Sequence, residues 1–570
     1  MDAICGILGK CDAAAVRLMA AALKHRGRAR SVIDEGENYC VASSAPAEDR
    51  PCLLDGSPRN ASGAPLTPSG LQHLCAAASS PDQLRLRGAF AAAVRVGKGW
   101  WLLRDRLGAK PLYYAQGDGW LVFASELKGV LASGYVRKRL NLCSVDRYLT
   151  LRCVPGPESI IQGVNRVRPG HVLEYAQGTS REMPYAGFDL TLRETKREEA
   201  SERLLELLRD AVRTSSTDMV LWSAGIDCAA VGALRAGAKP VFVTLKSAWQ
   251  AESWRARESA RLLGLAFRPL KARGLTENVF SQVAHCLDEP LADASVLPLW
   301  LVAEASAGAG PALLSGHGAD ELLGGYPRYH FLQKAHGARR LVPVSFVDEI
   351  IPSLPPNAFV RRGGRYLASI RDNLDAYLSL LSVFDAGERD ELYTEAMSAA
   401  IAEKGGSVSV MRPHFSDRDL TRNLLALSLN VALPDLLLAK CDRLWAAHGA
   451  SLEFPYLDDA LIDFAVSLPP RVKFGVRSKP LLRQAMKGVL PGRVRLRARR
   501  DFKVPQSGPT LRVIESAARE IVNQDRVEAA GVFRWPYVDQ VLRSSTHNVY
   551  RRRQFWALLM FFAWYRAFME

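Results

Sequence analysis

The chain has 570 residues, more than one hydrophobic core normally supports, so we expect two domains, with a third allowed. A composition of 48% hydrophobic and 24% charged residues excludes a disordered chain, and ten cysteines without a CxxC pair or zinc-like spacing exclude a disulfide framework and a structural zinc site. The net charge of +16 indicates an anionic partner, but no helix-turn-helix, zinc-finger or aromatic-rich basic motif is present, so nucleic acid is not expected.

We expect neither a secretory signal nor a membrane span. The first residues, MDAICGILGK, lack a basic region followed by a long apolar stretch. The longest apolar run near the end, 555–565, is far short of the roughly 20 residues that a spanning helix needs, and it predicts a buried C-terminal helix. Scattered cysteines are typical of a reducing compartment, which predicts a cytoplasmic protein.

Residues 1–178 are predicted to form a layered, largely antiparallel β domain. The apolar runs AFAAAVRV, WWLLRDR, PLYYAQ and WLVFASE follow one another at short intervals, and 117–119 (GDG) separates the last two in the manner of a hairpin turn. Residues 179–200 are polar and weakly patterned, which predicts a linker.

Residues 201–570 show a different pattern, in which strands alternate with helices. The predicted elements, in chain order, are helix SERLLELLRDAV, strand MVLW, strand VFVTL, helix SWRARESARLLG, a helical stretch around PLWLVAEASA and strand ALLSG. This alternation predicts an α/β fold with a doubly wound parallel sheet, whose ligands bind beyond the carboxyl ends of the strands. From about 330 to 480 the sequence is mostly helical.

The turn after strand MVLW, 223–228 (SAGIDC), has the composition of a phosphate-binding loop. Small residues let backbone N–H groups approach an anion, and the following helix adds the partial positive charge of its N-terminus. Asp227 would repel a phosphate unless a divalent cation bridges the two. For this hexamer alone, an ordinary strand-to-helix turn capped by aspartate is the alternative.

A second glycine-rich turn, 315–321 (SGHGADE), follows strand ALLSG at the same edge of the sheet and contains Asp320. A magnesium ion held against a triphosphate requires carboxylates of this kind from adjacent strand ends. The two turns together therefore predict a site for ATP and Mg²⁺.

These motifs resemble those of the asparagine synthetase family, of the glutamine-hydrolysing class B type. SAGIDC is similar to the family's SGGxDS pyrophosphate loop, and SGHGADELLGGY to its second ATP-site motif. CGILG and HRG near the start resemble glutaminase motifs, and RDRLGAKPLYY, LDEPLADASVLP, LLLAKCDRLWAAHGASLEFPYLDDALIDFAVSLPP and RSKPLLRQA follow in the family's order. The resemblance implies a glutaminase-like, Ntn-type β-sandwich joined to an ATP-pyrophosphatase domain with helical additions.

The resemblance also implies roles for individual residues. Asp227 and Asp320 would hold magnesium against ATP, and Lys479 would steady the charged transition state, for which a compact ammonium is suited. Outside its motif, Lys479 would be read as a solvated surface lysine. The residues implied at the nucleotide and its phosphates are Leu221, Ser223, Ala224, Gly225, Ile226, Asp227, Cys228, Thr244, Ser315, Gly316 and Asp320.

The N-terminal domain departs from the family pattern. Family glutaminases use a cysteine whose own α-amino group serves as base, whereas Cys5 follows four other residues. The glutamine-binding loop is degraded to DGSPRN at 55–60. We therefore expect a scaffolding domain without glutaminase activity; proteolysis that exposed Cys5 would reverse this expectation.

The second domain departs at three positions. His317 stands where asparagine synthetases carry an acidic residue and β-lactam synthetases a tyrosine, and a histidine there resembles the lasso-peptide cyclases. A neutral imidazole could take a proton from an attacking ammonium, worth about 10²–10⁴ in rate; a structural histidine is the alternative. Ala224 replaces a glycine, which would add strain if φ is positive there, and Cys228 replaces a serine.

The resemblance thus implies ATP-dependent formation of a macrolactam from a precursor peptide, with a leader-peptide-binding protein and a leader protease as partners. A glutamine-hydrolysing asparagine synthetase, a β-lactam-synthetase-like cyclase and a non-catalytic scaffold are the alternatives. The basic stretch 487–503 would face an acidic peptide or a leader-binding partner, with a merely solvated face as the other interpretation.

Overall fold

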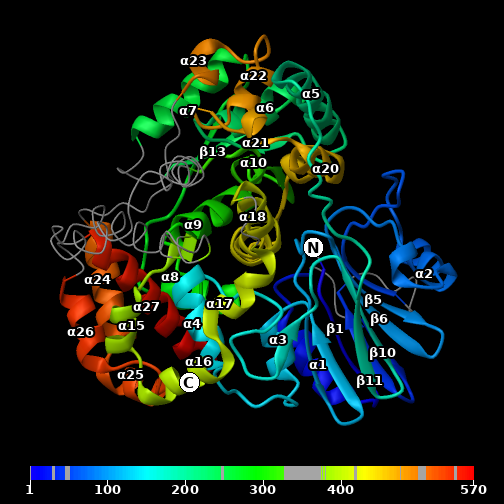
Figure 1. Cartoon of the computed structure of the whole chain (residues 1–570), viewed down its shortest axis with the longest axis vertical. Helices are drawn as coiled ribbons and strands as arrows, with labels where there is room; N and C mark the ends of the chain where they lie inside the picture. The colour runs from blue at the N-terminus through cyan, green and yellow to red at the C-terminus, as the bar shows by residue number, and fades with distance from the viewer. Residues whose placement is uncertain are drawn as a thin grey trace.

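The computed structural model describes residues 2–27, 32–44, 52–244, 250–326, 381–415, 420–475, 477–497, 509–544 and 549–570, together with Leu374, Tyr377 and Leu378. Figure 1 shows the N-terminal β domain in blue at the lower right and the parallel-sheet domain at the top. The C-terminal helices, in red, lie at the lower left.

The N-terminal domain is an antiparallel β-sandwich. One sheet has the order β2-β3-β1-β8-β7-β9 and the other β11-β10-β6-β5-β4, and the neighbouring strands are antiparallel. The strands are β1 (Ile4–Leu8), β2 (Val32–Gly36), β3 (Tyr39–Ser43), β4 (Cys52–Gly56), β5 (Phe90–Val96), β6 (Gly99–Arg104), β7 (Tyr113–Gly117), β8 (Trp120–Ala124), β9 (Val164–Arg166), β10 (His171–Ala176) and β11 (Thr179–Pro184). The predicted hairpin is confirmed, because Gly117 pairs with Trp120 across the turn that joins β7 to β8.

The alternation of side chains along the strands gives each sheet an inner and an outer face. The inner faces meet in a core that includes Leu8, Leu102 and Phe123. Helices α1 (Ala13–Ala22) and α3 (Leu127–Ala132) cover the outer face of one sheet, and α2 (Pro68–Ala77) covers the other. The predicted β-sandwich domain is confirmed.

The predicted linker, 179–200, is wrong at its beginning. Residues Thr179–Pro184 form β11, which pairs along its length with β10. Because β11 is an edge strand whose side chains are half-buried or exposed, it needs no apolar alternation, and its polar sequence hid it. An extended segment then leads to α5 (Arg197–Arg213), which begins before the predicted boundary at 201.

Helix α4 (Leu142–Leu151), although it belongs to the first 178 residues, leaves the sandwich. It packs against α16 (Glu395–Lys404) and α17 (Gly406–Met411), and Figure 1 shows it in cyan among the helices at the lower left. The hydroxyl of Tyr148 donates to the carbonyl of Ala557 at 2.7 Å. The N-terminal domain is therefore tied into the C-terminal one by an entire helix.

The second domain is built on a parallel sheet of order β14-β13-β12-β15-β16. Its strands are β12 (Met219–Leu221), β13 (Lys239–Thr244), β14 (Arg268–Lys271), β15 (Ala312–Leu314) and β16 (Ser451–Glu453). Helices α5, α6 (Ile226–Leu234) and α7 (Gln250–Leu262) share one core with the sheet, and α8 (Asn278–Leu287) and α9 (Val296–Ala307) share another. The predicted doubly wound sheet is confirmed; the short edge strands β14 and β16 had no apolar run to announce them.

The remaining described residues are helical, as expected. The α-helices are α10 (Ala319–Leu323), α15 (Ala386–Leu392), α18 (Leu420–Leu427), α19 (Ala439–Ala446), α20 (Asp459–Ser467), α21 (Pro470–Lys473), α22 (Pro480–Ala485), α23 (Gly492–Arg495), α24 (Pro509–Ile521), α25 (Gln524–Ala530), α26 (Trp535–Ser544) and α27 (Val549–Phe568). The 3₁₀ turns are η1 (Pro81–Gln83), η3 (Arg412–His414) and η5 (Pro455–Leu457), and η4 (Ser428–Leu438) is a π-helix. Helix α27 confirms the predicted buried C-terminal helix.

The continuous helical run Arg422–Ala446, made of α18, η4 and α19, is the feature most like a membrane span in the described part of the chain. It has 25 residues and a mean hydropathy of 1.6, yet 78% of its apolar window is buried inside the protein. Its apolar character follows from this burial, because a helix surrounded by protein needs no polar face.

Candidate active site

Both predicted turns lie at the carboxyl edge of the parallel sheet. The first joins β12 to α6, and its Ser223 hydroxyl accepts a hydrogen bond from Gly225 N at 3.2 Å. Asp227 lies in the first turn of α6, where the helix N-terminus contributes partial positive charge. Leu221 and Thr244 end the neighbouring strands β12 and β13, whereas the side chain of Ile226 packs in the core and can offer only its backbone to a ligand.

The second turn joins β15 to α10 and touches the first. A Cβ built on Gly316 would lie 2.8 Å from Cys228 N and 2.9 Å from Asp227 Cβ. Only a residue without a side chain permits this approach. Ser315 is buried and its N–H donates to the carbonyl of Glu453 at 2.9 Å, which ties the turn to β16. The close packing at Gly316 therefore brings the two glycine-rich turns together at one point.

Lys479 joins the two turns. Its Nζ lies 2.6 Å from Asp227 Oδ2 and 2.6 Å from Asp320 Oδ1. The lysine is 3% exposed and lies just before α22, with φ of 54°. Burial opposes its charge, but the attraction of both carboxylates raises the pKa of Lys479 above its usual value. Lys479 is a buried ammonium at the site, so the solvated-lysine interpretation is wrong.

The residues at this point fit a nucleotide with a divalent cation. Asp227 and Asp320 come from different turns and converge on one cationic group, the ammonium of Lys479. Hard carboxylate oxygens are the protein ligands that Mg²⁺ prefers, and Mg²⁺ commonly takes one or two of them together with substrate phosphates. Asp227 and Asp320 are accordingly the residues that would hold it.

His317 lies in the second turn with a partly buried ring. Its Nδ1 is 2.5 Å from Ser315 Oγ, and its ring is edge-on to Phe454, with centroids 6.5 Å apart. Burial, reinforced by the nearby ammonium of Lys440, lowers the pKa of His317 to about 4, although the carboxylate of Asp320 opposes the shift. The imidazole is therefore neutral at physiological pH and able to accept a proton.

The two substitutions in the first turn have different consequences. Ala224 does not have a positive φ, so the strain that an alanine would bring to such a position is not present. Its N–H donates to Glu252 Oε1 on α7 at 3.3 Å. Cys228 receives a hydrogen bond from the Ser223 hydroxyl at 3.4 Å, and burial raises the pKa of its thiol. Cys228 thus places a neutral thiol in the first turn, beside the hydroxyl of Ser223.

The structure describes residues 487–497 of the basic stretch 487–503. Arg499, Arg500 and Lys503 lie outside the described residues. Arg497 pairs with Glu258 at 2.8 Å and donates to the carbonyl of Arg255, which binds the segment after α23 to α7. The side chain of Arg497 is therefore engaged in contacts within the protein.

Comparison with known proteins shows the family of both domains. The family model described as asparagine synthase matches residues 203–566, and that of a glutamine amidotransferase domain matches 75–186. A putative asparagine synthetase [glutamine-hydrolyzing] of Mycobacterium bovis is 27% identical over 85% of this chain and 77% of its own length. The chain is 24% identical to asparagine synthetase [glutamine-hydrolyzing] 1 of Bacillus subtilis, over 82% of this chain and 75% of that protein, and 24% identical to amidase chry2 of Gibberella zeae, over 76% and 71%.

This chain belongs to the asparagine synthase family. It is therefore an ATP-dependent ligase with an amidotransferase-like N-terminal domain. The amidotransferase match begins at residue 75, so the part of the domain that holds Cys5 and the HRG motif lies outside it.

Cys5, the cysteine of the CGILG motif, is buried inside the N-terminal domain. It lies in β1, paired with Ala42 and Ala124, and is 1% exposed. Burial raises the pKa of its thiol to about 12. The preceding residue, Ile4, is fully buried, and its N–H donates to Ser125 Oγ at 3.0 Å, so the chain before Cys5 is part of the sheet. Exposure of Cys5 by proteolysis would require β1 to leave the sandwich.

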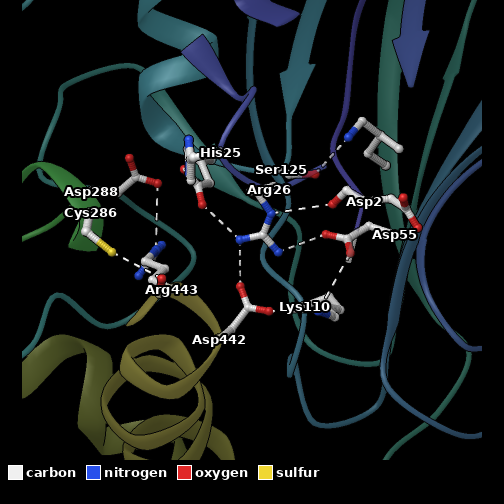
Figure 2. A network of polar contacts seen from close by, with 12 residues as sticks. Asp2, His25, Arg26, Asp55, Lys110, Ser125, Cys286, Asp288, Asp442 and Arg443 are labelled. Atoms are coloured by element: carbon white, nitrogen blue, oxygen red, sulfur yellow. Dashed lines mark hydrogen bonds and ion pairs between the residues drawn. The ribbon is translucent and has the colours of Figure 1, made fainter. Parts of the chain in front are cut away.

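Arg26 of the HRG motif lies at the centre of a buried ionic network (Figure 2). Its guanidinium pairs with Asp55 at 3.0 Å, Glu126 at 2.8 Å and Asp442 at 2.7 Å. Burial opposes the charge, but the carboxylates raise the pKa of Arg26 well above its usual value. Asp55 is the first residue of the DGSPRN segment, so this segment contributes a carboxylate to an internal ion pair.

The same network joins the two domains. Lys110 pairs with Asp442 at 2.8 Å, and Lys128 pairs with Asp288 at 2.8 Å and with Glu126. Asp288 belongs to the motif LDEPLADASVLP and Asp442 to α19. The sequence did not reveal these ion pairs beyond placing the residues in family motifs. Residue spacing cannot show which charged residues of two different domains will pair.

Proposed function

We propose that this chain activates the side-chain carboxyl of an Asp or Glu in a precursor peptide as an acyl-adenylate and joins it to the peptide's own N-terminal amine. The observation that carries the proposal is the state of Cys5, which is peptide-bonded to Ile4, buried in β1 and held as a neutral thiol. Such a residue cannot serve as the nucleophile of glutamine hydrolysis. The acceptor amine must then come from another source, and a peptide amine supplies it.

In the first step, an oxygen of the substrate carboxylate forms a bond to the α-phosphorus of ATP, and the bond to pyrophosphate breaks. The N-terminus of α6 and the turn at Ser223 and Gly225 would bind phosphate oxygens. The ammonium of Lys479 would balance the charge that develops on phosphorus-bound oxygen. Mg²⁺ held by Asp227 and Asp320 would supply charge neutralisation of the polyphosphate.

In the second step, the amine attacks the activated carbonyl, AMP leaves, and one proton must be removed from the new amide nitrogen. His317 lies in the turn that carries Asp320 and would accept this proton at Nε2, with Nδ1 donating to Ser315 Oγ. An anionic phosphate beside the ring would raise the pKa of His317 from about 4 toward the range of an effective base.

The test is incubation of the protein with ATP, Mg²⁺ and synthetic peptides that have a free amino terminus and one internal Asp or Glu. We expect release of AMP and pyrophosphate and, by mass spectrometry, a product that has lost one water. A peptide with an acetylated amino terminus is the control and should give no such product. Equal conversion of the acetylated peptide would contradict the proposal.

A glutamine-hydrolysing asparagine synthetase is the second candidate, and the names of the relatives from M. bovis and B. subtilis favour it. It predicts glutamate from glutamine and asparagine from aspartate. Incubation with glutamine, aspartate and ATP separates the two candidates: glutamate release that depends on Cys5 would replace our proposal with this one.

A further inference from the structure

Lys440, which the sequence does not single out, is a buried lysine near the reaction centre. It lies on α19 and is 7% exposed. Its Nζ donates to Asp293 Oδ2 at 2.7 Å and to Ser295 Oγ at 3.1 Å. An ammonium has three N–H donors, and among the described residues nothing accepts the third. Lys440 therefore has one donor to spare in a place where water is largely excluded.

Asp293 holds this ammonium in place, and both of its carboxylate oxygens accept hydrogen bonds. Its Oδ1 accepts from Ser295 N at 3.0 Å, while Oδ2 accepts from Lys440. Burial opposes its charge, but Lys440 and then Arg152 lower the pKa of Asp293 far below its usual value. Asp293 is therefore a fixed carboxylate that orients Lys440.

Arg152 brings a second cation to Asp293. It follows α4 in a left-handed conformation, with φ of 68°, which costs an L-residue about 1 kcal/mol. Its carbonyl accepts from Ala292 N at 2.9 Å, which ties it to the loop before Asp293. Its Nε is buried, and none of the described residues accepts from it. Asp293 therefore has one cation in direct contact, Lys440, and a second, Arg152, within electrostatic range, and within the described chain each cation keeps an unused donor.

This cluster adjoins the catalytic turn. Helix α19 packs against β16, and the carbonyl of Glu453 on β16 accepts from Ser315 N of that turn at 2.9 Å. The ammonium of Lys440 also acts electrostatically on His317 in the same turn. His317 thus lies under the influence of both Lys479, beside the proposed nucleotide site, and Lys440.

The ionic network of Figure 2 holds α19 from the opposite side. Asp442 on this helix pairs with Arg26 at 2.7 Å and with Lys110 at 2.8 Å (Figure 2). Residues two apart on a helix point in roughly opposite directions, so Lys440 faces the synthetase site while Asp442 faces the N-terminal domain. The N-terminal domain, without a usable nucleophile, still anchors the helix that carries Lys440.

We propose that Lys440, Ser295 and Arg152 form the subsite that binds the carboxylate of the acid substrate before it is adenylated, and that the Arg26 network positions it. This inference rests on the proposed acyl-adenylate chemistry and adds to it the recognition of the acid. A carboxylate fits because it is anionic, accepts from several donors at once and is the group that must reach the α-phosphorus. A purely structural ion pair between Lys440 and Asp293 would not explain why the Nε of Arg152 and the third N–H of Lys440 have no acceptor among the described residues.

Acid-dependent exchange of labelled pyrophosphate into ATP tests the subsite, with N-acetyl-aspartic acid α-amide and N-acetyl-glutamic acid α-amide as probes, because each has one free carboxyl. In Lys440→Met we expect the KM for the better probe to rise at least tenfold, the order of a lost charge-assisted hydrogen bond, and the KM for ATP to stay within twofold. Lys440→Arg should recover part of the loss. Ser295→Ala, a small change, should raise the acid KM two- to fivefold.

Two further variants protect the test from effects on folding. Lys440→Met/Asp293→Asn removes both charges of the pair, so no uncompensated carboxylate is left, and it should show the same selective rise in the acid KM. Lys239→Met removes a lysine that pairs with a different aspartate, Asp218, at 2.8 Å at the start of β13, and should leave the acid KM unchanged. An unchanged acid KM in Lys440→Met and Ser295→Ala, or equal rises for acid and ATP, would overturn the subsite. If the unaltered protein shows no exchange with either probe or with a peptide, the adenylation itself is refuted.

Discussion

Replacement of Lys479 by methionine tests the assignment of Asp227 and Asp320 as a shared cation site. The ammonium of Lys479 lies 2.6 Å from a carboxylate oxygen of each. Without it, two partly buried carboxylates face one another. Removal of one partner from a buried ion pair costs about 3–5 kcal/mol, but these carboxyl side chains are 24% and 22% exposed, so water reduces the loss to about 2 kcal/mol.

The variant should also respond to Mg²⁺ more strongly than the unaltered protein. A dication can enter where the ammonium was, and a ligand present at 100 times its dissociation constant stabilises a protein by about 3 kcal/mol. In the unaltered protein the ammonium competes for the same carboxylates. We therefore expect Lys479→Met to lose stability without Mg²⁺ and to regain most of it with Mg²⁺, while its adenylation activity stays low in both conditions.

Urea unfolding followed by tryptophan fluorescence, with and without Mg²⁺ at matched ionic strength, measures both effects. Lys128→Met is the matched control, because Lys128 also pairs with two carboxylates, Glu126 and Asp288, whose side chains are 0% exposed. It should lose about 3–5 kcal/mol, and Mg²⁺ should not restore this. Our reasoning fails if Mg²⁺ stabilises Lys479→Met no more than it stabilises the unaltered protein or the control.

Three other substitutions test single features of the site. Because the pKa of His317 is lowered to about 4, the unfolded chain binds a proton at higher pH than the native state does, so the free energy of unfolding falls as the pH drops from 6.5 toward 4. In urea titrations, His317→Asn should remove about 2 kcal/mol of the stability lost between pH 7.5 and pH 5. An unchanged pH dependence would show that the ring is solvated. Because the pKa of the Cys5 thiol is raised to about 12, iodoacetamide at pH 8 should label exposed Cys11 and spare Cys5 in peptide mass spectrometry, and Cys5→Ala should keep full peptide-dependent AMP release; labelled Cys5 or an inactive variant would restore a role for it. Gly316→Ala should separate the two turns, since its Cβ would lie 2.8 Å from Cys228 N, and lower kcat/KM for ATP by about 10²-fold in pyrophosphate-release assays, whereas Gly187→Ala, where a Cβ meets nothing within 4 Å, should be neutral; equal activity of both would place the turns farther apart than they are here.

Local pattern was sufficient for the strongest elements. The helices and central strands of the parallel sheet follow from apolar runs and glycine-rich turns, and these turns mark where ligands bind because the carboxyl ends of parallel strands share an edge. The edge strands β11, β14 and β16 were missed for the converse reason. Their side chains are largely half-buried or exposed, so no apolar period distinguishes them from loops.

The sequence by itself determined the family, the two glycine-rich turns at the carboxyl edge of the parallel sheet and the residues Asp227, Asp320 and Lys479, because each is carried by a short contiguous motif. Only the tertiary structure decided that Lys479 bridges both aspartates, across 252 residues from Asp227, and that Arg26 reaches Asp442 across 416. Pairings at such separations depend on how the domains pack, and a charge in the sequence does not reveal its partner. The same packing seals Cys5 and turns Lys440, unremarkable in the sequence, into a buried cation with a donor to spare.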